Sequence, residues 1–178
     1  SKVIISLGNH DIGYLNKKRN KNTKKWEYDK RIDFFNELNK EKNIHILDDD
    51  IYNDNNISFI GLTLSFKYYK ETNESKESFY EDIDNKKIKI DKSKYNIVLC
   101  HSPVYVLEDV KILKDVDLIL SGHMHNGMVH PIIEKVWKSN SGIISPTKKL
   151  YPKAKLTRGV VNKENKVLII SGGITKLS

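Results

Sequence analysis

The chain has 178 residues, with 31 Lys and Arg against 23 Asp and Glu, and one cysteine. This length suits a single domain over residues 1–178, which would bury roughly 70% of the surface that its unfolded chain exposes. A single cysteine excludes an intramolecular disulfide, and no apolar run reaches the roughly eighteen residues of a membrane span. The net charge of +8 comes mostly from dispersed lysines, which argues against specific nucleic-acid recognition.

The first third of the chain predicts one strand and one helix. Val3–Leu7 is an apolar run typical of a strand, and the basic stretch after Asp11, densest at Lys17–Lys25, is expected to be a solvated loop. Apolar residues recur at helical spacing over Tyr28–Asn39, which predicts an amphipathic helix that covers one face of a sheet.

The middle of the chain predicts more strands. Ile44–Leu47 and Ile57–Leu64 are β-rich runs separated by Asp and Asn turn residues, so we expect an antiparallel pair. A short helix is expected near Ser75–Ile83. The continuous apolar runs Asn96–Cys100 and Asp117–Leu120 are typical of parallel strands that are buried on both faces.

The end of the chain is less regular. A helical turn is expected within residues 105–114, between the two parallel strands. Residues 127–152 carry turn residues without a period and predict an ordered loop with short strands. Leu156–Asn162 and Lys166–Ser171, separated by three polar residues, predict a terminal hairpin.

Three polar segments each follow directly after an apolar run: Gly8–Asp11, Cys100–Pro103 and Gly122–His125. They contain four of the six histidines. If the three strands lie side by side in one sheet, their carboxyl ends bring these segments together. Imidazole and amide oxygen both bind borderline divalent metals, so the pattern predicts one metal site.

Each segment contributes particular groups. In extended backbone, His123 and His125 would point to the same side, with Met124 on the other. His101, at its strand end, is expected to be a metal ligand. Asn9 offers a neutral amide oxygen to a metal, and His10 offers an N–H to a phosphate oxygen or leaving group.

Other residues are open to a structural interpretation. Asp11 can orient a neighbouring group, or only cap the turn. Cys100 is expected to be a buried inert thiol, His45 to be structural, and Asp48–Asp50 to be a solvated turn. His130, five residues beyond His125, is a weaker candidate for the rim of the cleft.

At these three segments the chain resembles the calcineurin-like metallophosphoesterases, whose later motifs are GNH[DE], a histidine at a strand end, and GHxH. Here the motifs stand as Gly8–Asp11, His101 and Gly122–His125, in the same order. The hairpin-like Ile44–Leu64, residues 127–149 and Ser171–Gly173 resemble a bacterial branch of the family. The resemblance thus covers nearly the whole chain.

The resemblance implies an α/β fold, a four-layer sandwich of two mixed β-sheets flanked by helices. It also implies two divalent metal ions (Mn, Fe, Zn, Ni or Co). Asn9, His101 and His123 would bind one ion and His125 the other, while His10 and Asp11 would serve catalysis. The expected activity is hydrolysis of a phosphomonoester or phosphodiester by a metal-activated hydroxide.

The family's two earlier motifs, Asp-x-His and GDxxD, do not occur in the chain, so an N-terminal strand-helix portion is expected to be missing. The remaining ligands are neutral and do not offset the repulsion of two dications, so this chain alone is expected to be inactive. A free sheet edge at Val3–Leu7 would then permit self-association.

The expected substrate is a phosphorylated small molecule, lipid or protein, and no specific nucleic acid. The location is expected to be cytoplasmic, or membrane-associated through the absent segment. Two rival functions stay open: a non-catalytic binding or fold-bearing domain that retains the motifs, and a polyanion-binding module that uses Lys17–Lys25.

Overall fold

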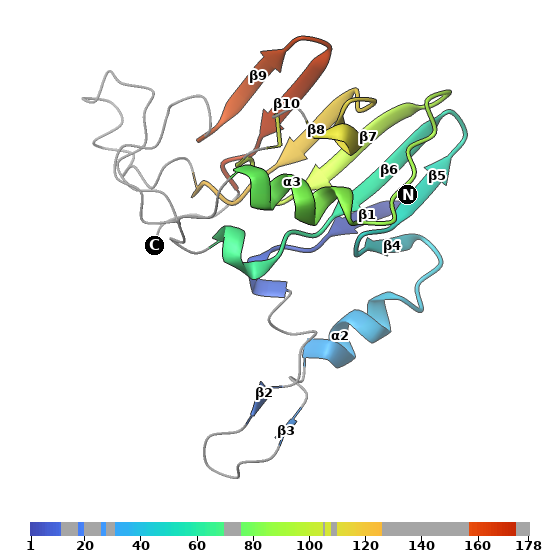
Figure 1. Cartoon of the computed structure of the whole chain (residues 1–178). Helices are drawn as coiled ribbons and strands as arrows, with labels where there is room; N and C mark the ends of the chain where they lie inside the picture. The colour runs from blue at the N-terminus through green and yellow to red at the C-terminus, as the bar shows by residue number, and fades with distance from the viewer. Residues whose placement is uncertain are drawn as a thin grey trace, which may run out of the picture.

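The computed structural model describes residues 1–11, 18–19, 26–27, 31–69, 76–104, 106–107, 110–125 and 157–173. Its centre is a six-stranded mixed sheet with the order β5-β6-β7-β8-β10-β9 (Figure 1). The four central strands are parallel, and each edge strand is antiparallel to its neighbour. The strands are β5 Ile51–Asp54, β6 Ile57–Leu62, β7 Tyr95–Cys100, β8 Leu118–Ser121, β9 Gly159–Lys163 and β10 Lys166–Ile170.

A second, two-stranded sheet packs on this one. It pairs β1 (Val3–Ser6) in parallel with β4 (Ile44–Leu47). The two sheets meet closely at Gly61 of β6, where a Cβ atom would lie 2.3 Å from the Cβ of Leu47. Only glycine fits at this contact.

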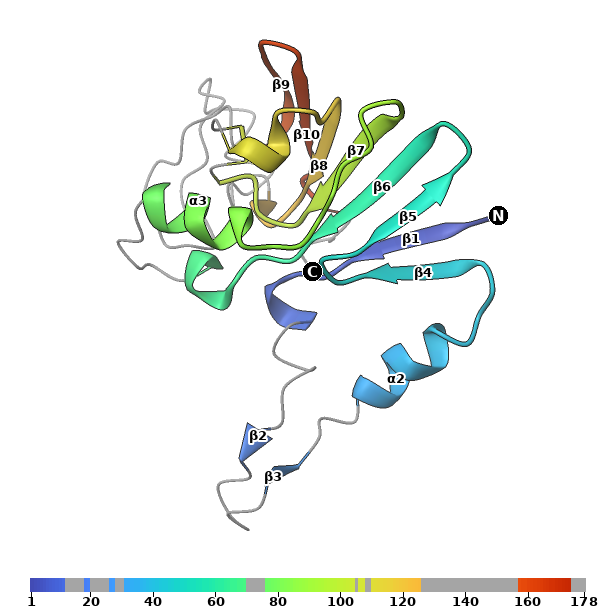
Figure 2. The same ribbon diagram turned by 45° about the vertical axis from the view of Figure 1, so that its right-hand side comes forward.

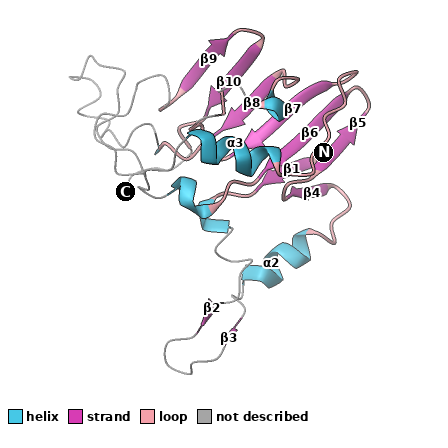
Figure 3. Cartoon of the chain, viewed as in Figure 1, coloured by secondary structure: helices cyan, strands magenta, loops and turns pink. Residues whose placement is uncertain are grey.

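Helices cover the opposite face of the six-stranded sheet. Helix α3 (Lys76–Asp84) and the short 3-10 helices η1 (Phe66–Tyr69) and η2 (Lys111–Leu113) lie on that face, with the two-stranded sheet on the other side (Figures 1 and 2). The main core lies between these helices and the six-stranded sheet, and it includes Phe79, Val98 and Ile119, all at most 1% exposed. The protein is therefore a mixed-sheet α/β fold with few helices, as Figure 3 shows, and the predicted fold class is confirmed.

Several individual predictions are confirmed. Strands form at Val3–Ser6, Tyr95–Cys100 and Leu118–Ser121, and helix α3 forms where a short helix was expected. The terminal hairpin is β9 and β10, whose turn places Glu164 at a φ of 54°. The expected helical turn before β8 is η2. The expected loop at residues 127–152 lies outside the described residues.

The predicted pairing of Ile44–Leu47 with Ile57–Leu64 is wrong. Ile44–Leu47 pairs with β1 in the second sheet, and the antiparallel partner of β6 is β5. Asn53 and Asp54 lie within β5, although they suggest a turn by composition. The tight turn is at Asn55 and Asn56, where Asn55 has a φ of 51°.

The expectation that all three motif-bearing strands share one sheet is also wrong. Strands β7 and β8 are neighbours, but β1 belongs to the two-stranded sheet. Because β1 contacts β6 and β7 from the other layer, its carboxyl end still arrives beside that of β7. The site therefore forms between two sheets.

Burial on both faces, predicted for β7 and β8, holds for one face only. Side chains that point toward α3, such as Val98 and Ile119, are buried. Those on the opposite face, Ile97, Leu99, Leu118 and Leu120, are only partly buried. Within the described part of the chain, the two-stranded sheet contacts β5, β6 and β7, so it leaves the apolar face over β8 and β10 less covered.

The prediction that the helix over residues 28–39 covers a sheet face is wrong. The helix forms as α2 (Arg31–Leu38), but it does not pack on a sheet. None of its described side chains, residues 33–38, is buried, and Phe34 is 58% exposed. Both views draw α2 pointing away from the sheets (Figures 1 and 2). The basic stretch expected to be a loop contains a small antiparallel pair, β2 (Lys18–Arg19) with β3 (Trp26–Glu27).

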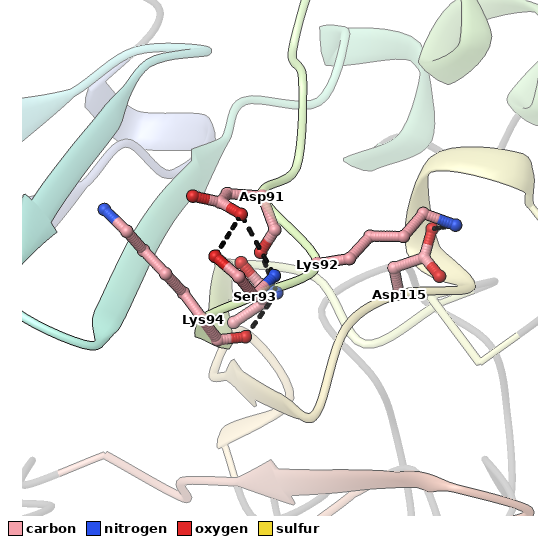
Figure 4. A network of polar contacts seen from close by, with 6 residues as sticks. Asp91, Lys92, Ser93, Lys94 and Asp115 are labelled. Carbon is pink, nitrogen blue, oxygen red and sulfur yellow. Dashed lines mark hydrogen bonds and ion pairs between the residues drawn. The ribbon is translucent and has the colours of Figure 1, made fainter.

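The amino ends of β7 and β8 are fixed by a polar network at the end of the sheet opposite the motifs (Figure 4). Asp91 Oδ1 accepts hydrogen bonds from Ser93 N and Oγ, at 3.0 and 2.6 Å. Asp117 Oδ2 accepts from Asn96 N at 2.7 Å. These bonds fix the start of the strand that carries His101 at its other end.

Among the described residues, no helix has the length and apolar character needed to cross a membrane.

Candidate functional site

The site is built around two imidazoles. The ring centroids of His101, just after β7, and His123, just after β8, lie 5.2 Å apart. Their strands are held together beyond the ladder by a hydrogen bond from Gly122 N to His101 O, at 3.0 Å. The predicted convergence of the strand ends of β7 and β8 is therefore present.

The Gly8–Asp11 segment reaches the same place from the other sheet. A Cβ atom at Gly8 would lie 2.8 Å from Cδ2 of His101, so this backbone runs directly against the imidazole. Gly8 N donates a hydrogen bond to Asp11 Oδ2 at 2.8 Å, and Asp11 N donates to Gly8 O at 3.0 Å. Asp11 thus closes the turn, which is the capping interpretation; its role on a substrate stays a prediction.

The backbone of the Gly122–His125 segment is not extended, contrary to expectation. His123 and His125 have φ values of 66° and 47°, in the left-handed region that costs energy for residues other than glycine. His123 is 5% exposed and Met124 is 3% exposed, whereas His125 is exposed. The two histidines therefore differ in exposure, with His123 in the interior and His125 at the rim.

Burial keeps the two central imidazoles neutral. Desolvation lowers the pKa of His101, although the nearby Asp11 carboxylate opposes this effect. Desolvation, helped by the charges of His101, His125 and His10, lowers the pKa of His123 to about 4. Because a metal binds the neutral form of imidazole, this shift removes the need to release a proton at neutral pH.

Buried polar atoms without a hydrogen-bond partner gather at this end of the sheets. Six such side-chain atoms occur among the described residues, and five belong to residues at or after the carboxyl ends of β1, β6 and β8: Asn9 Oδ1, Thr63 Oγ1, Tyr69 Oη, Ser121 Oγ and His123 Nε2. An unpaired buried polar atom costs roughly 1–3 kcal/mol and needs an explanation such as a bound ion or water.

The donor atoms in this region are of kinds that bind divalent ions. Asn9 Oδ1 and His123 Nε2 are unpartnered, and they belong with His101 to the same strand-end region. Amide oxygen and imidazole suit Mn, Fe, Co, Ni or Zn. Within the described part of the chain, however, no group of three or more His, Cys, Asp or Glu is arranged to hold a metal. None of the four candidate ligands, Asn9, His101, His123 and His125, is a carboxylate, so a second ion at His125 would have no anionic ligand from this set.

A pocket of about 180 Å³ adjoins the two imidazoles. Besides His101, His123 and His125, its walls include Gly122 and the segment Ser171–Gly173 that follows β10. Ser171 N donates to Ser121 O at 2.8 Å, which ties that segment to the end of β8. Its small side chains leave space next to the histidines.

Residues with a predicted structural role behave as expected. Cys100 is fully buried, and desolvation raises the pKa of its thiol to about 12, so it is inert. His45 stacks on Tyr52 with ring centroids 3.8 Å apart. Asp48, Asp49 and Asp50 are all exposed, as expected for a solvated turn, and Asp49 also accepts from Thr63 N at 2.9 Å and pairs with Lys86. His130 lies outside the described residues.

Sequence reasoning missed Tyr69. Its ring centroid lies 5.1 Å from that of His123 and 6.0 Å from that of His101. It is 6% exposed, and its hydroxyl has no partner among the described residues. Its position in a polar stretch seven residues after β6 carries no pattern that points to a site.

The fold and this site define a protein of the metallophosphoesterase class. A family model described as calcineurin-like phosphoesterase matches residues 1–127, so the chain belongs to that family. Members of the family are typically dependent on divalent metals and are phosphoesterases. No curated protein and no solved structure matches the chain significantly.

Proposed function

We propose that this protein is a metal-dependent hydrolase of phosphate esters that works at the His101–His123 site. One observation carries the proposal: two buried ligand atoms, Asn9 Oδ1 and His123 Nε2, lack any partner among the described residues and stand in the same region as His101. A protein without a ligand there would leave both atoms unsatisfied at a cost in stability.

Asn9, His101 and His123 would hold one divalent ion. When bound, such an ion supplies Lewis acidity, which stabilises the charge of a phosphoryl group and lowers the pKa of water. His125, exposed at the rim, would be a ligand of a second ion, which would also need anionic ligands because two dications repel each other.

The other residues would act on the substrate. His10 is exposed and follows the Gly8 turn, so its ring N–H can donate a hydrogen bond to the leaving oxygen. Asp11 holds that turn through its bond to Gly8 N, which positions His10. The pocket beside His101 and His123 would take the phosphoryl group with part of the group esterified to it.

The substrate we propose is a phosphoester of a small molecule, lipid or protein. No specific nucleic acid is proposed, since the charge is spread over dispersed lysines.

The test compares metal binding with turnover. Purified chain is titrated with Co²⁺, followed by visible absorption and calorimetry, and then assayed with p-nitrophenyl phosphate. We expect one ion to bind at the site and His123→Ala to weaken binding by about ten-fold or more. His45→Ala, which removes an imidazole stacked on Tyr52, is the matched control and should bind like the wild type.

The neutral donors predict weak affinity, so metal concentration must reach saturation. Binding with little or no turnover is the expected result for this chain, because its neutral ligands do not offset the charge of two ions. Turnover that a chelator abolishes and that His123→Ala loses would show that the site is complete without further anionic ligands. Equal Co²⁺ affinity in wild type and His123→Ala would refute the proposed site.

A further inference from the structure

Tyr69 is a buried polar residue for which packing alone gives no full account. It lies in η1, and its ring meets His123 edge to face, with an interplanar angle of 71°. The hydroxyl is buried without a hydrogen-bond partner among the described residues. A phenylalanine would fill the same space without the cost of an unsatisfied hydroxyl.

Its neighbour shows the usual solution. Tyr68 is equally buried, at 6% exposure, but its Oη donates to Asp82 Oδ2 at 2.9 Å and lies 3.4 Å from Ser78 Oγ. Two adjacent tyrosines thus differ in one respect: the hydroxyl of Tyr68 is satisfied within the fold, and that of Tyr69 is not.

The partner missing from Tyr69 should therefore be something that the site binds. Tyr69 contacts both central histidines, and it shares their region with the unpartnered Asn9 Oδ1 and His123 Nε2. A phenol O–H donates well to anionic oxygen.

We propose that Tyr69 is a positioning residue whose hydroxyl donates a hydrogen bond to a phosphoryl oxygen of the bound substrate. The inference rests on the proposed function, because it takes the ligand of the site to be a phosphate ester. The site would then have a neutral hydrogen-bond donor from η1 in addition to the histidines at the strand ends. No covalent step involves Tyr69.

The experiment measures stability and ligand binding in two matched variants. Without ligand, Tyr69→Phe should unfold at a temperature equal to or higher than that of the wild type, because it removes an unsatisfied hydroxyl. Tyr68→Phe should unfold at a lower temperature, because it breaks the bond to Asp82. If the hydroxyl of Tyr69 were instead satisfied within the fold, Tyr69→Phe would lower the unfolding temperature as Tyr68→Phe does.

Binding is then measured by calorimetry with phenylphosphonate, on chain saturated with Co²⁺. Loss of a hydrogen bond to a charged oxygen should weaken phenylphosphonate binding by about ten-fold or more in Tyr69→Phe. Tyr68→Phe should bind it like the wild type. Co²⁺ affinity should be the same in all three proteins.

The outcomes separate the two proposals. Absence of Co²⁺ binding in the wild type would refute the proposed function and this inference with it. Co²⁺ binding with equal phenylphosphonate affinity in wild type and Tyr69→Phe, or with no phenylphosphonate binding at all, would overturn the role of Tyr69 alone. If Tyr69→Phe does not fold, 3-fluorotyrosine encoded at position 69 reports directly: its ¹⁹F resonance should shift with phenylphosphonate, and an unchanged resonance would overturn the inference.

Discussion

Desolvation and an unusual backbone conformation determine the properties of individual residues at the site. His123 combines a φ of 66° with 5% exposure, and its Nε2 has no partner among the described residues. Such local cost persists only where the surrounding structure fixes it, and it is commonly found at functional positions. The pairing of β7 with β8 and the packing of Tyr69 and His101 against the His123 ring supply that constraint.

This burial predicts a pH dependence of stability for the metal-free chain. The folded-state pKa of His123 is about 4, below its ordinary value of 6.5, so the unfolded chain takes up a proton first as pH falls. Its contribution to the free energy of unfolding is constant above about pH 6.5 and is lost between pH 6.5 and 4, by on the order of 2 kcal/mol. Urea unfolding in EDTA at several pH values measures this loss.

The matched variants are His123→Gln and His45→Gln. The first should flatten the loss of stability over this window, and the second should keep the wild-type slope. Equal slopes in the wild type and His123→Gln would contradict the assignment of the pH dependence to His123.

The sequence predicted the histidines of the site because they stand at strand ends, where chain direction and burial are predictable. The capping bond of Asp11 to Gly8 N was one of the two interpretations that the sequence left open, because it is a local contact across three residues. The sequence did not predict the left-handed backbone at His123 and His125. Tyr69 was not predicted at all. Its neighbours in space come from β7 and β8, which are distant in the sequence.

At the scale of elements, local runs were predictable and pairing was not. Ile44–Leu47 has the composition of a strand in any sheet, and turn residues on its C-terminal side suggested a hairpin with β6. Pairing with β1 instead crosses about 40 residues, and no local signal encodes such a partner. The contact between the sheets depends on Gly61, whose role is invisible until Leu47 is placed against it.

That contact gives a stability prediction. In Gly61→Ala, the new Cβ would stand 2.3 Å from Leu47 Cβ and 2.5 Å from its backbone oxygen, so β4 must shift as a whole. We expect the free energy of unfolding to fall by about 2 kcal/mol or more, as for overpacked cores. Chemical denaturation measures the change.

Gly122→Ala is the control for the loss of a glycine. Its Cβ would have its nearest contact at 3.7 Å, to His101 Nδ1, which is ordinary van der Waals distance. Its unfolding midpoint should stay near that of the wild type. An unchanged midpoint in Gly61→Ala as well would show that the two sheets do not pack as closely as described.

At the scale of the molecule, one sheet covers only part of the other. β4 contacts β5 and β6, and β1 contacts β6 and β7, so the second edge of β1, which pairs with no strand among the described residues, faces the side of β8 and β10. On that side the apolar face is only partly buried, although the sequence of these strands suits burial on both faces. A strand added to β1 would gain backbone hydrogen bonds and cover apolar side chains at once.

We therefore expect the isolated chain to self-associate through β1 as protein concentration rises. Two β1 strands paired antiparallel would place both six-stranded sheets on the same side, where they would collide, so parallel pairing is expected.

Val3, 43% exposed on β1, is the position to test. Val3→Lys should shift sedimentation velocity toward monomer, because a charge on an edge strand opposes pairing. Val160→Lys, on edge strand β9, is the matched control and should associate like the wild type. A monomeric wild type at all concentrations, or equal association in both variants, would count against the β1 edge.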